Sequence, residues 1–286
     1  MALPSIIILG KGYLGTRFIE YFEDRAVRVD VDITNLADLE KVIVEHNPTV
    51  VINAAGKTLT SEIEKPENRA LAFLVNVQGP ANLAYLAHKY TFHLIQLSTC
   101  MVYGGPVPKD GWRETDQVSP ANYYGWTKAW ADAELTPFAE RDHITIVRIR
   151  TPLSAVSNPR NLLNKLQTYT SVVDEPSSLT VVEDMLMGVD QLITKKVYGV
   201  FNLVNPGVIS LYSIAREMQQ GGLIPEDKQI KALTSNDLEK INVAIGKASQ
   251  PFPILNIGKL QSAGIHLRNV HIAVTESINQ FNLTAV

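Results

Sequence analysis

A short glycine-rich turn near the start of the chain sets the strongest constraint on its fold. A β-branched run at residues 5–9 leads directly into Gly10-Lys11-Gly12-Tyr13-Leu14-Gly15, and a helical pattern follows. In such a turn the first glycine permits the tight bend, the second lets the backbone approach a pyrophosphate, and the third lets helix and strand pack closely. The phosphates then lie at the helix N-terminus. These six residues therefore predict a dinucleotide-binding βαβ unit.

An acidic residue about 20 positions after this turn is expected to bind the ribose of the dinucleotide. Asp30 and Asp32 are the two candidates, and either carboxylate also fits a strand end or a turn. Asp30 would repel a 2'-phosphate, whereas Lys11 and Arg17 would attract one. The residues alone leave the choice between NAD and NADP open.

The first 150 residues alternate strand-like and helix-like patterns, as in βαβ units on a parallel sheet. The predicted strands are residues 5–9, 27–31, 49–54, 93–98 and 144–149. A helix is expected behind an Asn35 cap, and another at about 69–90, with a kink or break at Gly79 and Pro80. After residue 151 prolines separate shorter elements, and 200–204 reads as one more strand.

The predicted fold is therefore α/β, a Rossmann-type doubly wound parallel sheet with a smaller C-terminal substrate-binding part. Residues 1–150 form the dinucleotide-binding domain, with a returning strand near 199–204. Residues 151–286 are mainly the substrate-binding domain.

Composition excludes several other classes of protein. The single cysteine among 286 residues allows no intramolecular disulfide, and no charged stretch followed by an apolar one begins the sequence, so a cytoplasmic location is expected. The apolar runs are far shorter than the roughly 20 residues of a membrane span. A net charge of -3 with scattered lysines and arginines predicts no nucleic-acid partner. The histidines lack metal-ligand spacing, so no metal is predicted.

A tyrosine and a lysine predict the reaction chemistry. Tyr124 and Lys128 are four residues apart, which places them one turn apart on one helix face. An ammonium near a phenol lowers the phenol pKa toward the working pH, as a proton donor or acceptor for a carbonyl requires. Ser98 and Thr99 end the strand that precedes this helix.

In this combination of motifs the chain resembles the extended short-chain dehydrogenase/reductase family. The resemblance rests on the glycine turn and on Asp32-Ile33-Thr34, Asn53-Ala54-Ala55-Gly56, Asn76-Val77-Gln78-Gly79, Ser98-Thr99, Val102-Tyr103-Gly104 and the Tyr124 to Lys128 stretch. It implies that Tyr124 is the acid/base, that Lys128 tunes it and holds the nicotinamide ribose, and that Thr99 hydrogen-bonds the reacting carbonyl. It also implies NADP(H), slightly preferred over NAD(H), with further contacts from Asp32, Ile33, Ala54, Ala55, Gly56 and Asn76.

Within that family the second half is similar to dTDP-4-dehydrorhamnose reductases and to the UDP-4-keto-6-deoxyglucose 3,5-epimerase/4-reductases of UDP-rhamnose synthesis. The matching strings are Arg148-Ile149-Arg150-Thr151-Pro152, Asn158-Pro159-Arg160-Asn161, Lys165, Leu179-Thr180-Val181 and residues 201–208. They imply reduction of a 4-ketone on a nucleotide-diphosphate sugar. A catalytically silent subunit of the same fold is the alternative, and the choice between monomer and homodimer stays open.

The same strings imply substrate contacts from Arg150, Asn158, Arg160 and Asn161. A guanidinium fork suits a diphosphate. The alternative is a helix that Pro159 begins and Asn158 caps. Glu183 and Asp184 read as first-turn charges of a later helix.

Epimerisation at C3 and C5 needs two more acid/base groups, for which Lys165 and Cys100 are the candidates. Lys165 matches a lysine of the bifunctional relatives, and a solvated helix lysine is the alternative. Those relatives have Thr-x-Cys, whereas here Cys100 follows Thr99 at once and Met101 takes the expected place. Alternation along a strand turns Cys100 away from the face of Thr99, unless the loop rotates it back.

Overall fold

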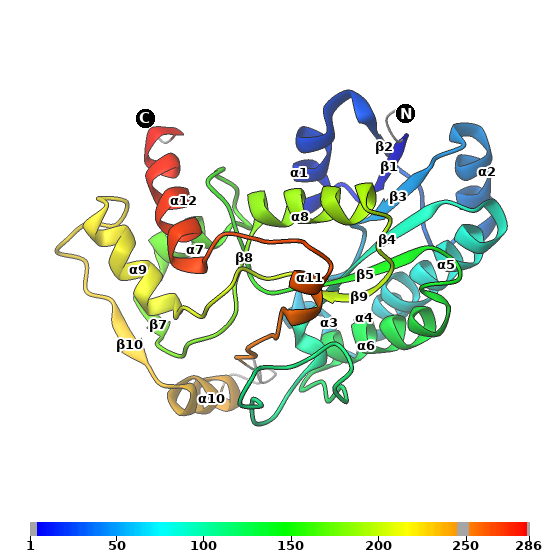
Figure 1. The fold of residues 1–286 in the computed structure, drawn as a ribbon. Coiled ribbons are helices and arrows are strands. Elements are labelled where there is room, and N and C mark those ends of the chain that lie inside the picture. The colour runs from blue at the N-terminus through cyan, green and yellow to red at the C-terminus, as the bar shows by residue number, and fades with distance from the viewer. Residues whose placement is uncertain (1–4, 245–251, 285–286) are drawn as a thin grey trace.

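A six-stranded, fully parallel sheet forms the centre of the molecule (Figure 1), with strand order β2-β1-β3-β4-β5-β9. The computed structural model describes residues 5–244 and 252–284. The strands are β1 (Ile6–Leu9), β2 (Ala26–Val29), β3 (Val50–Asn53), β4 (His93–Thr99), β5 (Ile144–Ile149) and β9 (Gly199–Asn202). The chain moves outward from β1 to β2 and then returns to β3 on the other side of β1. Such a reversal leaves a crevice beyond the carboxyl ends of β1 and β3.

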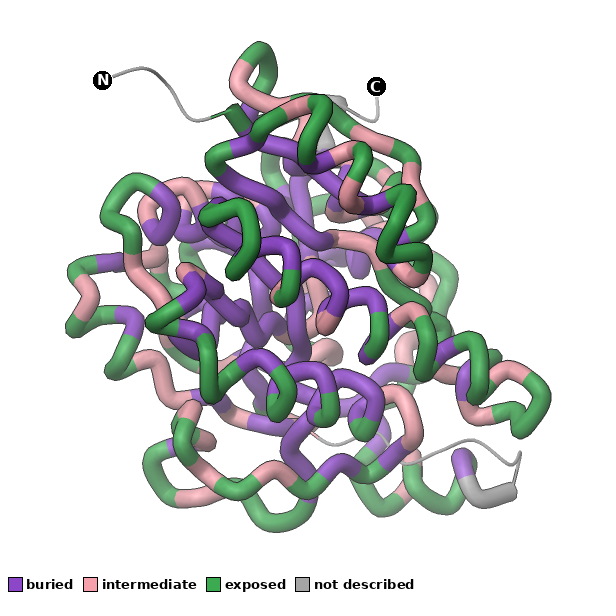
Figure 2. The backbone as a smooth tube through the Cα atoms, turned by 90° about the vertical axis from the view of Figure 1, so that its right-hand side faces the viewer, coloured by how far each residue is buried: buried purple, intermediate pink, exposed green. Residues whose placement is uncertain are grey.

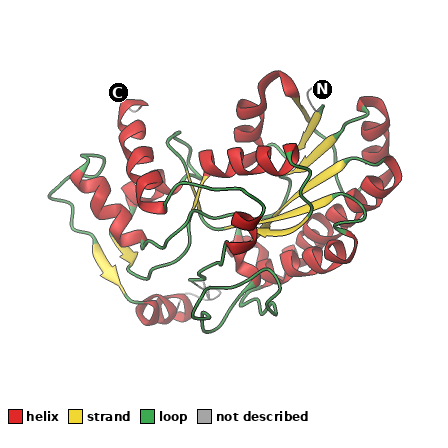
Figure 3. Ribbon diagram, viewed as in Figure 1, coloured by secondary structure: helices red, strands yellow, loops and turns green. Residues whose placement is uncertain are grey.

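Helices cover both faces of this sheet, because the strand side chains alternate between two apolar layers. Ile6 and Ile8 of β1 join the layer beneath α1 (Tyr13–Phe22) and α8 (Val182–Thr194), whereas Ile7 and Leu9 join the opposite layer. That second layer is covered by α2 (Leu36–His46), α5 (Gly79–Tyr90) and α6 (Tyr123–Leu135). Figures 2 and 3 show the buried strands between the helices. The α/β prediction, with a Rossmann-type parallel sheet, is confirmed.

The predicted strands form, with slightly different ends. β2 stops at Val29 and β9 at Asn202, and β9 pairs with β5 at the edge of the sheet. Asn35 caps α2 as predicted, since its side chain accepts a hydrogen bond from the Asp38 N–H. The division of the chain at residue 150 stays a prediction.

The long helical segment does not break at Gly79 and Pro80 as expected. It runs from α4 (Pro66–Phe73) through a π-helical stretch at Leu74–Gln78 into α5. The wider π turn lies just before Pro80, where the ladder must tolerate a missing N–H. A Cβ on Gly79 would lie 2.5 Å from Ile33, so this glycine serves close packing instead. By length and composition Pro66–Tyr90 could cross a membrane, but half of its most apolar window is buried inside the molecule.

Most of the remaining elements form a smaller C-terminal part around their own apolar cluster (Figure 1), whereas α11 packs through Leu260 against the central sheet. Its strands pair as β6 with β8 and β7 with β10. The bounds are β6 (Pro152–Leu153), α7 (Leu162–Thr168), β7 (Ser171–Val173), β8 (Thr180–Val181), α9 (Leu211–Gln220), β10 (Lys231–Leu233), α10 (Ser235–Ala244), α11 (Gly258–Ser262) and α12 (Val270–Thr284). A short α3 (Thr60–Ile63) and the 3-10 turns η1 (Glu23–Arg25), η3 (Cys100–Val102) and η4 (Thr136–Phe138) complete the described chain.

Candidate active site

The glycine turn lies at the crevice between β1 and β3 and leaves room for a phosphate group. Gly10 has φ +104°, and a Cβ there would lie 2.5 Å from the backbone N of Ala55. A Cβ on Gly15 would overlap the carbonyl oxygen of Gly10. A Cβ on Gly12, by contrast, would meet nothing within 4 Å. The turn is therefore closed on its inner side and open where Gly12 begins α1, which fits a dinucleotide pyrophosphate at the helix N-terminus.

The charged residues around this turn are arranged differently from the sequence expectation. Lys11 forms an exposed ion pair with Asp30, 2.8 Å from Nζ to Oδ2, which offsets the charge of that carboxylate. Asp32 closes a turn by accepting hydrogen bonds from the N–H and hydroxyl of Thr34, and these lower the pKa of Asp32. Arg17, expected to attract a 2'-phosphate, is tied to Glu20 and Glu183 instead.

Arg28 of β2 is the exposed cation that the sequence did not single out here. Its Nη2 donates to the Thr16 hydroxyl of α1 at 3.1 Å, so the guanidinium lies beside the first helix. The sequence offered one signal for Arg28: strands of a parallel sheet are usually apolar throughout, so a charged side chain within one indicates an exposed or functional position.

The side chains of two residues predicted as cofactor contacts, Asn76 and Ile33, make contacts within the protein. Asn76 Nδ2 donates to the Lys57 carbonyl and to Thr127 Oγ1, and its Oδ1 accepts from the Lys57 N–H at 2.8 Å. This amide is committed within the chain, so Asn76 positions the segment after β3 rather than offering a free group. The Ile33 side chain is 3% exposed and faces the core at Gly79, for the same reason of packing. Ala54, Ala55 and Gly56 follow β3 at the crevice, as expected.

Thr99, Tyr124 and Lys128 come together at the carboxyl end of β4. Thr99 ends the strand, and Tyr124 lies in the first turn of α6. Burial raises the pKa of Tyr124, and the nearby Thr99 side chain opposes that rise. Lys128 is buried one turn on, and its Nζ donates to the Leu97 carbonyl at 2.7 Å. Burial lowers the pKa of Lys128 to about 8, which a nearby carboxylate at Asp132 opposes.

The start of α6 is fixed from three sides, which places Tyr124 accurately. Asn122 caps the helix by accepting from the Gly125 N–H at 2.8 Å. Glu64, which the sequence reading missed, accepts from the Tyr123 N–H at 2.9 Å and supplies a negative charge at the helix N-terminus. A Cβ on Gly125 would overlap the Met101 carbonyl oxygen, so only glycine lets α6 approach the turn after β4 this closely.

Cys100 lies in the 3-10 turn η3, where strand alternation no longer applies. Its thiol is fully buried in an apolar cluster against which Tyr124 packs. The rotation of Cys100 toward the substrate, which the sequence left open, stays a prediction. Burial raises the thiol pKa, so the thiol keeps its proton.

The predicted substrate residues fall into committed and exposed groups. Asn161, not Asn158, caps α7, and its amide also bonds the backbone of Ser154 and Val156. Both polar atoms of the Asn161 amide are thus used within the chain, and the substrate contact assigned to this residue stays a prediction. The Asn158 side chain accepts from the Arg160 N–H, and Arg160 is exposed. Lys165 on α7 is near Arg160, and partial burial together with that charge lowers the Lys165 pKa.

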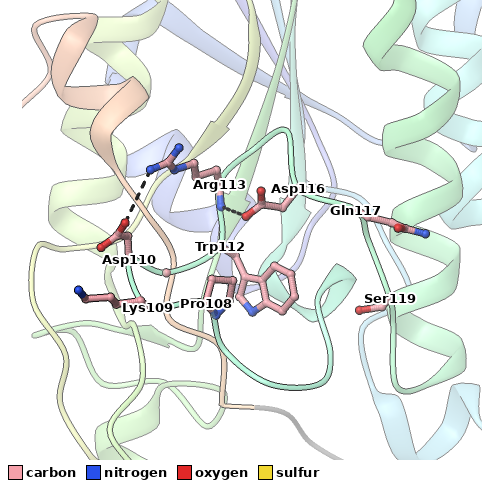
Figure 4. A pocket seen from close by; sticks show the side chains of 9 residues that line it. Pro108, Lys109, Asp110, Trp112, Arg113, Asp116, Gln117 and Ser119 are labelled. Atoms are coloured by element: carbon pink, nitrogen blue, oxygen red, sulfur yellow. Dashed lines mark hydrogen bonds and ion pairs between the residues drawn. The ribbon is translucent and has the colours of Figure 1, made fainter.

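The loop between η3 and α6 encloses a cavity of about 670 Å³, with Trp112 and Arg113 in its wall (Figure 4). Trp112 stacks on Tyr103, with ring centroids 5.0 Å apart. Trp112 and Tyr124 both pack against the apolar cluster that contains Tyr103 and Cys100, so this cluster connects the cavity wall with Tyr124. No group of three histidine, cysteine or carboxylate residues that could hold a metal lies in residues 5–244 and 252–284.

Residues 5–282 match the model of the RmlD substrate binding domain family. The chain belongs to this family. It is 26% identical over 293 residues to protein L780 of Acanthamoeba polyphaga mimivirus, covering 96% of this chain and 97% of that one. The crystal structure of L780, described as a UDP-rhamnose synthase, superimposes with a TM-score of 0.88 at 23% identity, covering 98% of this chain and 100% of that one.

Two further similarities extend the comparison. A bifunctional dTDP-4-dehydrorhamnose 3,5-epimerase/dTDP-4-dehydrorhamnose reductase of Arabidopsis thaliana is 27% identical over 218 residues, covering 72% of this chain and 71% of that one. A dTDP-4-dehydrorhamnose reductase of Bacillus anthracis in complex with NADP has a TM-score of 0.84 at 22% identity, covering 99% of both chains. The chain also spans about a third (32%) of a trifunctional plant enzyme. At these identities the structures show the fold alone.

Proposed function

We propose that this chain reduces the 4-keto group of a nucleotide-linked 4-keto-6-deoxyhexose, in the synthesis of a rhamnose-type nucleotide sugar. The observation that carries the proposal is the placement of Thr99 at the end of β4 near the Tyr124 phenol, with Lys128 one turn further along α6, and with an open glycine turn at the start of α1. The names of the relatives support it, since reductases of this substrate class recur among them. The substrate is a nucleotide-diphosphate sugar.

The side chains divide the reaction between them. The Thr99 hydroxyl, at the end of β4 near Tyr124, donates to the carbonyl oxygen of the substrate and positions it. Tyr124 keeps its proton because burial raises its pKa, and it donates that proton to the oxygen as negative charge develops there. The Lys128 ammonium stabilises the phenolate that remains. A nicotinamide dinucleotide whose pyrophosphate is held at the Gly10 to Gly15 turn would supply the hydride for the sugar carbon.

A conservative pair of variants tests this assignment. Tyr124→Phe removes the proton donor, so reduction of UDP- or dTDP-4-keto-6-deoxyglucose should fall by at least about 100-fold, followed as loss of NADPH absorbance. The dissociation constant of the cofactor should change by less than about twofold. Tyr123→Phe is the matched control, because its hydroxyl lies on the exposed side of the same helix turn. Equal turnover in the two variants would exclude Tyr124 as the acid.

Wild-type turnover also separates the enzyme from a silent subunit of the same fold. A silent subunit would bind the cofactor yet turn over none of the nucleotide-linked 4-keto sugars. The presence of Thr99, Tyr124 and Lys128 together at the carboxyl end of β4 favours the enzyme.

NADP(H) is the proposed cofactor, with NAD(H) as the alternative. Lys11 and Arg28 supply positive charge beside the turn, although Asp30 offsets the first. We expect kcat/KM to be higher with NADPH than with NADH, and Arg28→Ala to reduce that ratio. An unchanged ratio would remove Arg28 from the choice of cofactor.

Epimerisation at C3 and C5 is a second candidate activity, favoured by the lowered pKa of Lys165. A lysine that loses its proton readily can act as the base, whereas the buried, protonated Cys100 thiol could serve only as the acid. We expect Lys165→Met to abolish solvent-deuterium incorporation at C3 and C5 while reduction of an already epimerised substrate continues. NMR analysis of the product reports both steps. Undiminished incorporation in Cys100→Ala would remove the thiol from the mechanism.

A further inference from the structure

A third polar side chain follows Tyr124 and Lys128 along the same face of α6. Asp132 is four residues beyond Lys128 and is 3% exposed. Its Oδ2 accepts from Arg148 Nε at 2.8 Å, while its Oδ1 is buried and has no hydrogen-bond partner among the described residues. A buried carboxylate with one oxygen unsatisfied is costly. Its charge therefore needs a reason beyond joining helix to sheet.

Arg148 holds this carboxylate from the sheet. The guanidinium is 4% exposed, because β5 lies in the middle of the sheet and α6 covers it. Register pairs Arg148 with Ser98, the residue between Leu97 and Thr99, so the Arg148 side chain shares the face of the sheet on which Ser98 lies. Asp132 is thus fixed behind the strand end that carries Thr99.

The other side of Arg148 reaches the cavity loop. Its Nη1 donates to the Tyr103 hydroxyl and, at 3.2 Å, to the Glu114 carbonyl. The Tyr103 hydroxyl donates in turn to the Arg113 carbonyl at 2.7 Å, and the Tyr103 ring stacks on Trp112. Trp112 and Arg113 line the cavity of Figure 4. One continuous set of contacts therefore runs from α6 to the cavity wall.

Electrostatics connect Asp132 with the reacting groups. The titratable groups that face Lys128 and Tyr124 are Asp132 on their own helix and Cys100 from η3. Arg150 lies near Cys100. The groups around Asp132 are Arg148, Tyr103 and Glu114. Burial lowers the pKa of Lys128 to about 8, and Asp132 is the one carboxylate that opposes this effect. Without it, the lysine would lose its proton at a lower pH.

We propose that Asp132 is a positioning residue, which, held by Arg148, keeps Lys128 charged behind Tyr124 and ties that setting to the wall of the cavity. This inference rests on the proposed reductase function for its catalytic consequence, and on Lys128 alone for its electrostatic one. The ammonium is present below its pKa and lost above it, so kcat declines as pH rises through about 8. Removal of the Asp132 charge moves this decline to lower pH.

Asp132→Asn tests the proposal, because the amide preserves the shape and can still accept from Arg148. The control is Glu134→Gln, which removes an exposed carboxylate from the same helix. We expect Asp132→Asn to lower kcat about tenfold at pH 7.5, to shift the alkaline limb by about one pH unit and to leave KM within about twofold. The control should match the wild type. A coincident profile in Asp132→Asn would overturn the proposal.

A direct titration keeps the inference separate from the proposed function. With 13C-labelled lysine, and Lys128→Met to identify the signal, NMR should show the Lys128 pKa lowered in Asp132→Asn. This holds even if the wild-type protein reduces no 4-keto sugar, an outcome that would defeat the proposed function alone. An unchanged Lys128 titration would defeat the inference alone.

A double variant separates electrostatics from folding. Asp132→Leu with Arg148→Met replaces the buried ion pair by apolar side chains, an exchange that often preserves stability. We expect the double variant to melt near the wild-type temperature. Its alkaline limb of kcat should still lie at the lower pH seen in Asp132→Asn. Recovery of both would show that the pair serves the fold only.

Discussion

At the scale of single residues, Gly12 and Gly15 separate binding from folding. The Gly12 position faces open space, so Gly12→Ala should change the free energy of unfolding by no more than about 1 kcal/mol, as expected at a helix N-cap. The added methyl group would nevertheless keep a pyrophosphate away, and we expect the cofactor dissociation constant to rise at least about tenfold. Gly15→Ala should instead lower the free energy of unfolding by about 1–3 kcal/mol, because the new methyl group overlaps the Gly10 carbonyl oxygen.

Thermal unfolding without cofactor and a fluorescence titration with cofactor measure these two effects independently. Gly12→Ala that melts well below the wild type, or Gly15→Ala that melts with it, would contradict the roles given to the two glycines.

Residues with a chemical signature were predictable, whereas residues that serve through their neighbours were not. Thr99, Tyr124 and Lys128 were found because strand end and helix spacing bring them together. Asp132 continues the same four-residue spacing, but a carboxylate on a helix is usually solvated, so nothing in the sequence showed that it is buried against Arg148. Asn76 and Asn161 were given ligand contacts because a sequence does not show which amides the backbone itself consumes.

At the scale of elements, the π-helical stretch before α5 joins the two halves of the crevice. Asn76 lies in it and bonds both Lys57, after β3, and Thr127, in α6. We expect Asn76→Ala to cost about 2–3 kcal/mol, because it removes three hydrogen bonds of a buried side chain and leaves the buried Thr127 hydroxyl without its donor. Asn68→Ala on α4 is the control, since Asn68 makes one exposed bond to the Glu62 carbonyl and should cost less than about 1 kcal/mol.

Urea unfolding measures the free energy of unfolding of the Asn76→Ala and Asn68→Ala variants. A change in kcat reports whether α6 has shifted. Equal costs at the two asparagines would mean that the π stretch is not what aligns Lys57 with α6. The sequence predicts a kink or a break at Gly79 and Pro80, because proline disrupts a helix. The structure has a π-helical stretch at Leu74–Gln78 directly before them, and the helical segment continues without interruption.

At the scale of the whole molecule, the order of strands was predictable in kind because apolar runs alternate with helical patterns through the first half. The second half was harder to place, since many of its short elements, separated by prolines, bury their apolar faces against one another and others pack on the central sheet. α8 shows the difficulty. It follows the substrate-binding strings in sequence, yet it packs with α1 on the dinucleotide-binding sheet. Contacts made by the first turn of α8 therefore decide how the central sheet and the smaller C-terminal part are joined.

Asp184 in that turn makes the joint, in addition to the first-turn charge that the sequence suggested. It is 1% exposed and accepts from Arg268 Nε, before α12, at 2.8 Å and from Asn205 Nδ2, after β9, at 2.6 Å. Arg268→Met should destabilise the protein by about 2–4 kcal/mol, because a buried carboxylate loses its cation. Lys41→Met, which breaks an exposed pair with Asp38, should cost less than about 1 kcal/mol. If Arg268→Met unfolds in urea with the same midpoint as Lys41→Met, the central sheet and the C-terminal part are held together by apolar contacts alone. Recovery of stability in Arg268→Met with Asp184→Leu would instead locate the cost in the unpaired charge.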